Sequence, residues 1–128
     1  MPAPIWAQNL TIRVALEDRR EDLPDLLWRR KRNGRQSSSG VTYLPRYERP
    51  ARIVVVAGSS RIDQKLILLH ELAHWLAPPN DHHSPVFWDI AWRLYRQHKV
   101  PIRYAKERES EYRQGAVLAY KRSRKGGA

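Results

Sequence analysis

The segment over residues 60–79 constrains the fold of this chain more than any other part of the sequence. Ser60 with Asp63 three residues later is an acidic variant of the capping box, which begins a helix by satisfying its first backbone N–H groups. Apolar residues then recur at helical spacing, and Pro78-Pro79 must end the helix because proline lacks an N–H and restricts the preceding residue. The sequence therefore predicts a helix over about residues 61–76.

Within this predicted helix, His70, Glu71 and His74 form an H-E-x-x-H motif. The i, i+4 spacing places both imidazoles on one face, one turn apart, which suits two ligands of a tetrahedral zinc ion. Glu71 is rotated by about 100° from His70, so it borders the ion and can act as general base toward a metal-activated water. The pattern predicts a catalytic zinc site. The competing interpretation is a helix with two spare histidines, or a core pair satisfied by backbone groups.

The third ligand is not contained in the motif, although a catalytic zinc normally takes three protein ligands and leaves one position open. A metzincin would need Gly and His three and six residues after His74, where Ala77 and Asn80 stand. The remaining histidines are His82 and His83, which the Pro-Pro break allows to turn back toward the helix. An acid on a later helix stays open as an alternative, and its candidates are Glu107, Glu109 and Glu111.

This region resembles the SprT-like (Spartan-type) zinc metallopeptidases. The residues that carry the resemblance are LLHELAHWL, a short polar turn, and HSPVFW at the start of a helix. In that family the third ligand is a histidine followed by a small residue, with an aromatic or apolar residue four places after the histidine. His83, Ser84 and Phe87 match this pattern, with Ser84 in place of the usual Gly, and His82 matches less well. With GVTYL and RIVVV upstream, the similarity spans roughly residues 40–94.

The resemblance implies an α+β, zincin-like minimal metalloprotease fold. In it a small, mostly antiparallel sheet packs on the HExxH helix and a following helix, and the sheet's edge strand can bind an extended peptide. It also implies a zinc-dependent peptidase that hydrolyses protein or peptide substrates, with one Zn²⁺ ion on His70, His74 and His83 and with Glu71 as base. The alternatives are a basic nucleic-acid-binding protein with a structural or vestigial zinc site, and a zincin-fold hydrolase of a non-peptide substrate.

The formal net charge of +11 suggests contact with a polyanion. Basic residues concentrate in segments 29–35 and 121–125, which we expect to be the nucleic-acid contacts if DNA is bound. Spartan-type proteins act on DNA-linked proteins, and many carry a C-terminal four-Cys zinc ribbon. This chain has no cysteine, so any DNA contact would come from the two basic segments alone.

Length and composition predict one globular domain over residues 1–120, followed by a basic disordered tail over residues 121–128. The start of the chain does not have the pattern of a signal peptide, and no apolar run approaches the length of a membrane span. The absence of cysteine fits a reducing compartment. We therefore expect a cytoplasmic protein with no membrane association, while the oligomeric state does not follow from the sequence.

The other elements are expected from shorter patterns. Ser84 and Pro85 should begin a second helix with Phe87, Ile90, Ala91 and Leu94 on its buried face. Trp75, Trp88 and Trp92 are interpreted as core or pocket wall, and Asp81 or Asp89 as a partner that orients a ligand imidazole. The remaining expectations are strands at 10–17, 41–44 and 51–57, a helix at 22–32, an extended piece at 99–104 and a helix at 106–120.

Overall fold

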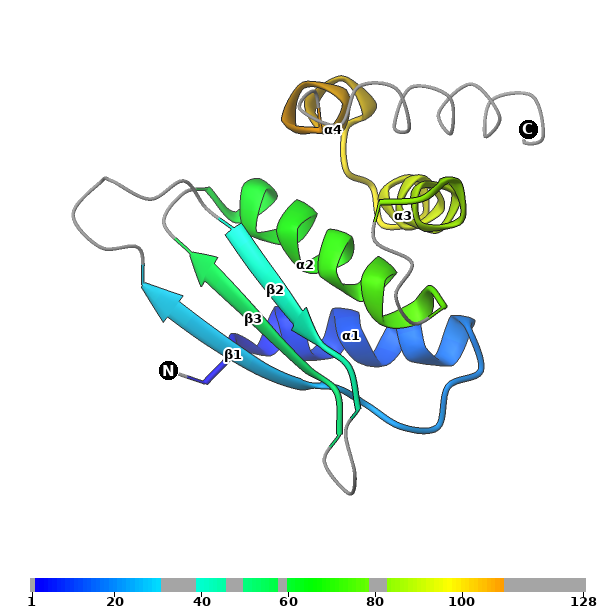
Figure 1. Ribbon diagram of the computed structural model, residues 1–128. Helices are drawn as coiled ribbons and strands as arrows, with labels where there is room; N and C mark the ends of the chain where they lie inside the picture. The colour runs from blue at the N-terminus through cyan, green and yellow to red at the C-terminus, as the bar shows by residue number, and fades with distance from the viewer. Residues whose placement is uncertain (1, 31–38, 46–49, 58–59, 79–82, 110–128) are drawn as a thin grey trace.

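The computed structural model describes residues 2–30, 39–45, 50–57, 60–78 and 83–109, and these form an α+β fold (Figure 1). This confirms the expected class. The expectations that concern residues 31–35, 80–82 and 110–128 lie outside the described residues. In chain order the elements are α1 (Ile5–Glu17), β1 (Asp25–Arg30), β2 (Ser39–Tyr43), β3 (Arg52–Ala57), α2 (Arg61–Leu76), α3 (Pro85–Gln97) and α4 (Ile102–Arg108).

The three strands form one sheet in the order β1-β3-β2. β3 is the central strand, as its β-branched run predicts, with β1 parallel to it and β2 antiparallel to it. The sheet is therefore mixed, and the expectation of a mostly antiparallel sheet is wrong. The reason is that β3 inserts between two strands of opposite direction, so it can be antiparallel to only one of them.

The first helix lies where a strand was expected, and the first strand lies where a helix was expected. The alternation of apolar residues over 10–17 predicted a strand, but this segment belongs to α1, and Ile12 and Leu16 are 43% and 72% exposed. Its buried positions instead follow the helical period, because small residues face the protein: Ala7, Thr11, Val14 and Ala15.

The segment expected as a helix over residues 22–32 contains β1. Its contiguous apolar residues pair with β3, and Leu26 and Trp28 lie opposite Ile53 and Val55 in the register. Trp28 is 5% exposed and packs edge-on against Trp6 of α1, with the ring centroids 5.9 Å apart. Tertiary pairing thus overrides a helical spacing that the segment also satisfies.

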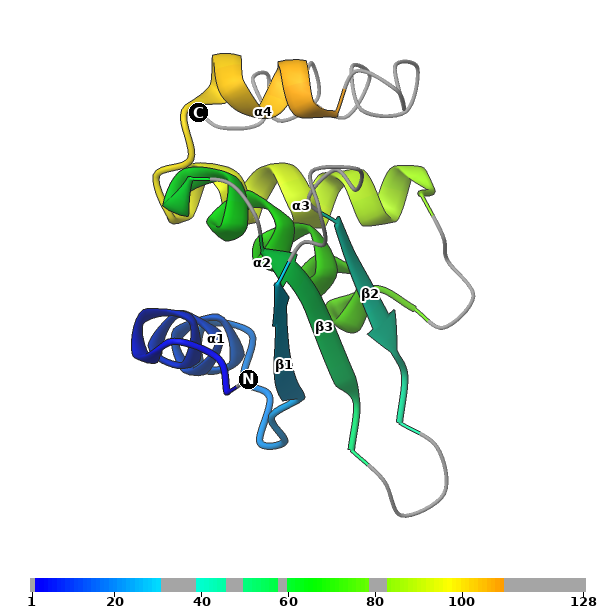
Figure 2. The same ribbon diagram turned by 90° about the vertical axis from the view of Figure 1, so that its left-hand side faces the viewer.

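The helices lie in layers on one side of the sheet. α1 and α2 cover the same face of the strands, and α3 and α4 stack on the side of α2 opposite α1 (Figures 1 and 2). α2 is thus the central element and contacts β2, β3, α1 and α3. None of the helices in the described part of the chain is long and apolar enough to span a membrane.

Local signals predict the starts of α2 and α3 correctly. The Ser60 side chain accepts a hydrogen bond from the backbone N–H of Asp63 (3.4 Å), and Ser84 caps α3 in the same way through Phe87 N–H (3.3 Å).

The interpretation of the three tryptophans as core residues is also confirmed, since each of them is at most 2% exposed. The stripe of α3 is buried as expected at Phe87, Ala91 and Leu94, and Ile90 is half-buried.

The extended piece expected at residues 99–104 is wrong. Lys99 takes a left-handed φ of 62° after the end of α3, and Pro101 then caps α4. His98 is the C-cap residue of α3, and it is buried against α1 through a 2.8 Å contact with Glu17 Oε1. The chain therefore turns sharply after α3, and α4 packs back on the helical layer.

Candidate metal centre

The candidate metal centre lies where α2 meets the residue before the α3 cap. His70 and His74 stand one turn apart on α2, and His83 directly precedes Ser84. One ligand nitrogen from each imidazole lies within 4.8 Å of the other two. The structure therefore brings the three predicted histidines close enough to bind a metal ion, while His82 lies outside the described residues.

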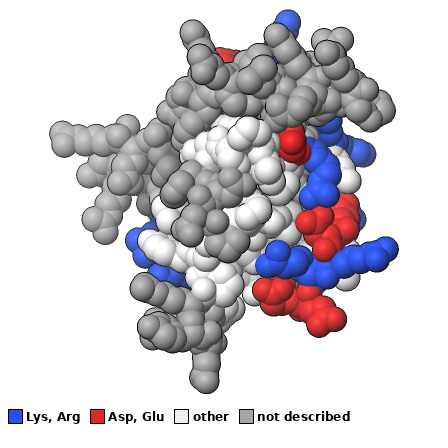
Figure 3. All heavy atoms as spheres, turned by 45° about the vertical axis from the view of Figure 1, so that its right-hand side comes forward, with Lys and Arg blue, Asp and Glu red and all other residues white. Residues whose placement is uncertain are grey.

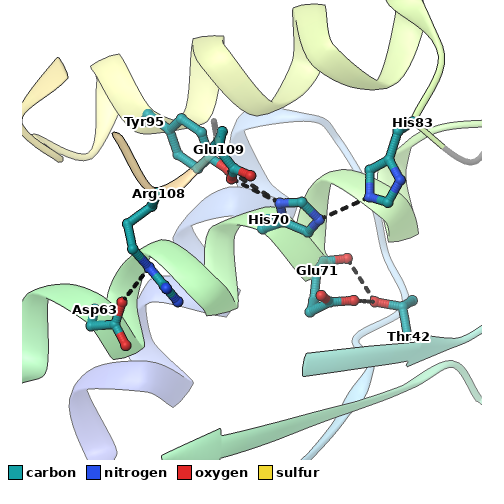
Figure 4. Close-up of polar contacts among 8 residues, drawn as sticks. All are labelled: Thr42, Asp63, His70, Glu71, His83, Tyr95, Arg108 and Glu109. Carbon is teal, nitrogen blue, oxygen red and sulfur yellow. Dashed lines mark hydrogen bonds and ion pairs between the residues drawn. The ribbon is translucent and has the colours of Figure 1, made fainter. Parts of the chain in front are cut away.

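The distance between His70 and His83 suits a zinc ion. His70 Nε2 lies 3.2 Å from His83 Nε2 (Figure 4). Two imidazole nitrogens bound to a tetrahedral zinc at about 2.0–2.1 Å each would be roughly 3.3 Å apart. The donor set is also chemically appropriate, because neutral imidazole is a common zinc ligand. The side chains present therefore fit a zinc ion.

Aromatic side chains of α3 surround the three imidazoles. The His74 ring stacks on Phe87 with the centroids 4.1 Å apart, and the His83 ring stacks on Trp88 at 5.7 Å. Phe87 and Trp88 are completely buried, so their own rotamers are held by the core. The two core aromatics thus also restrict the orientations of the imidazoles, which lowers the entropy lost when an ion binds.

Glu71 lies on the sheet side of α2, beside the histidines, and is 6% exposed. The Thr42 hydroxyl of β2 lies 2.8 Å from Glu71 Oε1 and 3.0 Å from the Glu71 main-chain oxygen (Figure 4). Burial raises the pKa of the Glu71 carboxyl, while the nearby His70 and the hydrogen bond from Thr42 oppose that rise. A buried carboxylate with a raised pKa, held in place by a neighbouring hydroxyl, has the properties of a general base.

Gly40 allows β2 to approach α2 at Glu71. A Cβ atom at this position would lie 2.6 Å from Glu71 Cγ and 3.0 Å from Ile67 Cγ2. Both distances are shorter than ordinary van der Waals contact, so a side chain here would displace the carboxylate or the strand. The sequence by itself predicted no such role for Gly40, although the glycine at the start of GVTYL was a visible signal.

We expect the replacement Gly40→Ala to displace the Glu71 side chain and to destabilise the fold by about 1–3 kcal/mol, the usual cost of overpacking. Urea unfolding would measure the change in the free energy of unfolding. Val41→Ala is the matched control, because Val41 is 47% exposed on the opposite face of the strand. Equal unfolding free energies for Gly40→Ala and wild type would contradict the close-packing argument.

Glu109 occupies the far side of His70 and was expected only as an alternative metal ligand. Its Oε1 lies 2.9 Å from His70 Nδ1, whereas His70 Nε2 points to His83 (Figure 4). Glu109 therefore contacts the ring nitrogen of His70 that does not contact His83. Of the two residues expected to orient a ligand imidazole, Asp89 is exposed and Asp81 lies outside the described residues.

Tyr95 of α3 completes the contacts behind His70. Its hydroxyl donates to Glu109 Oε1 at 2.5 Å, and its oxygen lies 3.4 Å from His70 Nδ1. Burial, together with the negative charge of Glu109, raises the pKa of Tyr95 well above its ordinary value. The tyrosine thus stays protonated and remains a hydrogen-bond donor to the carboxylate.

No protein-family model, curated protein or solved structure matches this chain. Membership of the SprT-like family, expected from LLHELAHWL and HSPVFW, therefore stays a hypothesis. The function has to be argued from the geometry of the metal centre and its surroundings.

Proposed function

We propose that this protein is a zinc-dependent peptidase of the SprT-like, zincin type. The observation that carries the proposal is the convergence of three imidazoles with a buried carboxylate held beside them. In this proposal His70, His74 and His83 bind the ion and Glu71 is the general base. The substrates are proteins or peptides.

Zinc is the metal that this donor set favours, although other first-row divalent ions also bind imidazole. A set of three protein ligands is typical of catalytic zinc, whereas structural zinc usually has four. When bound, zinc supplies Lewis-acid polarisation of the substrate carbonyl and lowers the pKa of a water molecule. The chain's own contribution is to hold the ligands and to move the proton.

Glu71 is positioned for that proton transfer. Its carboxylate can take a proton from the attacking water and deliver it to the leaving amine, as an acid–base residue does in peptide hydrolysis. The Thr42 hydroxyl orients one carboxylate oxygen, and Gly40 allows β2 to lie close enough for this contact. The base is therefore held by the edge strand of the sheet as well as by its own helix.

The edge strand supports a peptide as the substrate. β2 ends the sheet order β1-β3-β2, so one side of its backbone is left unpaired by the other described strands. Edge strands can bind an extended peptide through main-chain hydrogen bonds. A peptide aligned along β2 would lie next to Thr42 and Glu71, which is where a scissile bond would have to be. The same arrangement supports a zincin-like fold.

A nucleic-acid-binding protein with a structural zinc is the second candidate, and the net charge of +11 favours it. On the face drawn in Figure 3, however, Asp and Glu side chains lie among the Lys and Arg side chains. Arg93, for example, pairs with Asp18 at 2.9 Å. A structural site also gives no reason to bury a carboxylate beside the ligands, so we favour the peptidase and treat DNA as a partner that would bring substrates.

The full chain loaded with zinc should cleave a fluorescently labelled unfolded protein, with or without added DNA. A chelator should abolish the cleavage, and added zinc should restore it, because the ion is required for the reaction. Cleavage that is insensitive to the chelator would reject the proposal. A protein that binds zinc and cleaves nothing in either condition would support the structural-zinc alternative instead.

A further inference from the structure

We propose that Glu109, held by Tyr95, is a positioning residue for His70: it keeps the proton on Nδ1 and so leaves the Nε2 lone pair directed at the metal ion. We also propose that the packing of α4 on α2 positions Glu109 for this contact. The inference rests on the metal site of the proposed function and does not depend on the reaction that the site catalyses.

The first step is the state of the His70 ring. A neutral imidazole has one N–H donor and one acceptor nitrogen. An ionised carboxylate can only accept, so the contact of 2.9 Å between Nδ1 and Glu109 Oε1 requires the proton to be on Nδ1. Nε2 is then the acceptor, and it faces His83 Nε2 at 3.2 Å. This is the tautomer that can bind an ion between the histidines.

The second step is the environment of the carboxylate. Glu109 is 3% exposed and Tyr95 is fully buried, so water contributes little to solvating the negative charge. The Tyr95 hydroxyl donates its one proton to the same oxygen that accepts from His70. Two donors thus hold Glu109 in place, and histidine ligands commonly depend on a carboxylate partner of this kind for orientation and basicity.

The third step is how the chain brings Glu109 to His70. Asp63 and His70 are seven residues apart, so they lie on the same face of α2, about two turns from one another. From α4, the Tyr104 hydroxyl donates to Asp63 Oδ1 at 2.7 Å. Arg108 Nε lies 2.7 Å from the same oxygen, as Figure 4 shows. Asp63 therefore anchors α4 along α2.

This anchor matters because α4 is short. A helix of seven residues is marginal by itself, and its place depends on tertiary contacts. Glu109 directly follows Arg108, so fixing Arg108 at Asp63 also limits where the Glu109 side chain can reach. Asp63 is buried, with 5% of its surface exposed, and its contacts with Tyr104 and Arg108 hold α4 in place. Holding α4 in place positions Glu109 beside His70.

The test compares Glu109→Ala, Glu109→Gln and Tyr95→Phe with wild type in the full chain. Zinc affinity is measured by competition with a chromophoric chelator, and the His70 tautomer of the metal-free protein by ¹⁵N–¹H NMR. We expect Glu109→Ala to weaken zinc binding about 10–100-fold and to move the His70 proton away from Nδ1. Tyr95→Phe should act in the same direction with a smaller effect.

Glu107→Ala is the matched control, because Glu107 is an exposed carboxylate on the same helix, and it should leave both readouts unchanged. If Glu109→Ala does not fold, Glu109→Gln keeps the side-chain volume and still removes the charge. Unchanged zinc affinity in the Glu109 variants would overturn the proposal, and so would weaker binding by Glu109→Ala with the His70 proton still on Nδ1. A wild-type protein that binds zinc but has no peptidase activity would overturn only the proposed function.

Discussion

The replacement Glu71→Gln should abolish hydrolysis while leaving about one zinc ion per chain. Glutamine keeps the size of the side chain and can still accept a hydrogen bond from Thr42, but it cannot take a proton from water. General-base catalysis typically contributes about 10²–10⁴ in rate, so we expect a loss of at least about a hundredfold. A cleavage assay with elemental analysis of the same sample measures both quantities.

The control for this variant is Glu107→Gln, which removes an exposed carboxylate of α4 away from the metal centre. It should retain both activity and zinc. A Glu71→Gln variant with wild-type activity would show that the catalytic assignment is wrong. Loss of zinc from Glu71→Gln would mean that the carboxylate supports the ligands rather than the reaction.

The replacement His83→Ala should remove the metal, whereas His82→Ala should keep it. Zinc binding worth about 10–16 kcal/mol from four ligands corresponds to roughly 3 kcal/mol for each, so losing one ligand should weaken affinity by at least about a hundredfold. His83 is the histidine whose nitrogen lies 3.2 Å from His70 Nε2. Chelator competition on each purified variant gives the two affinities.

His82→Ala is itself the matched control, because it removes the adjacent imidazole and retains Pro78-Pro79 and the α3 cap. Thermal unfolding of the metal-free His83→Ala variant should resemble that of wild type, since His83 is half-buried and does not belong to the hydrophobic core. If His82→Ala loses zinc and His83→Ala keeps it, the ligand assignment must be exchanged. Full zinc affinity in both variants would place the third ligand elsewhere.

The sequence predicts α2 and the placing of its two histidines well because the signals for this helix are local. The Ser60 cap, the helical spacing of apolar residues and the prolines after the helix all act within a few residues of one another. The same is true of the cap at Ser84. Both helices therefore begin where the sequence predicts, and the histidines of α2 meet His83 next to the α3 cap.

The N-terminal region shows why periodicity fails elsewhere. Residues 10–17 satisfy a two-residue alternation, yet Thr11, Val14 and Ala15 are buried at helical spacing because α1 packs small residues against its neighbours. β1 satisfies a helical spacing, yet it pairs with β3, which lies more than twenty residues later in the chain. In short apolar segments the two periods overlap, and the partner surface decides between them.

By itself the sequence determined helix α2 with its two candidate ligands His70 and His74, the neighbouring Glu71 and the start of α3, since each depends on residues within a few turns of one helix. Only the tertiary structure decided that Gly40 and Thr42 of β2 lie against Glu71, and that Glu109 lies behind His70. The partners in these contacts are 29 and 39 residues apart for Thr42–Glu71 and His70–Glu109. Contacts of such separation arise from how the elements pack, and no local pattern encodes them.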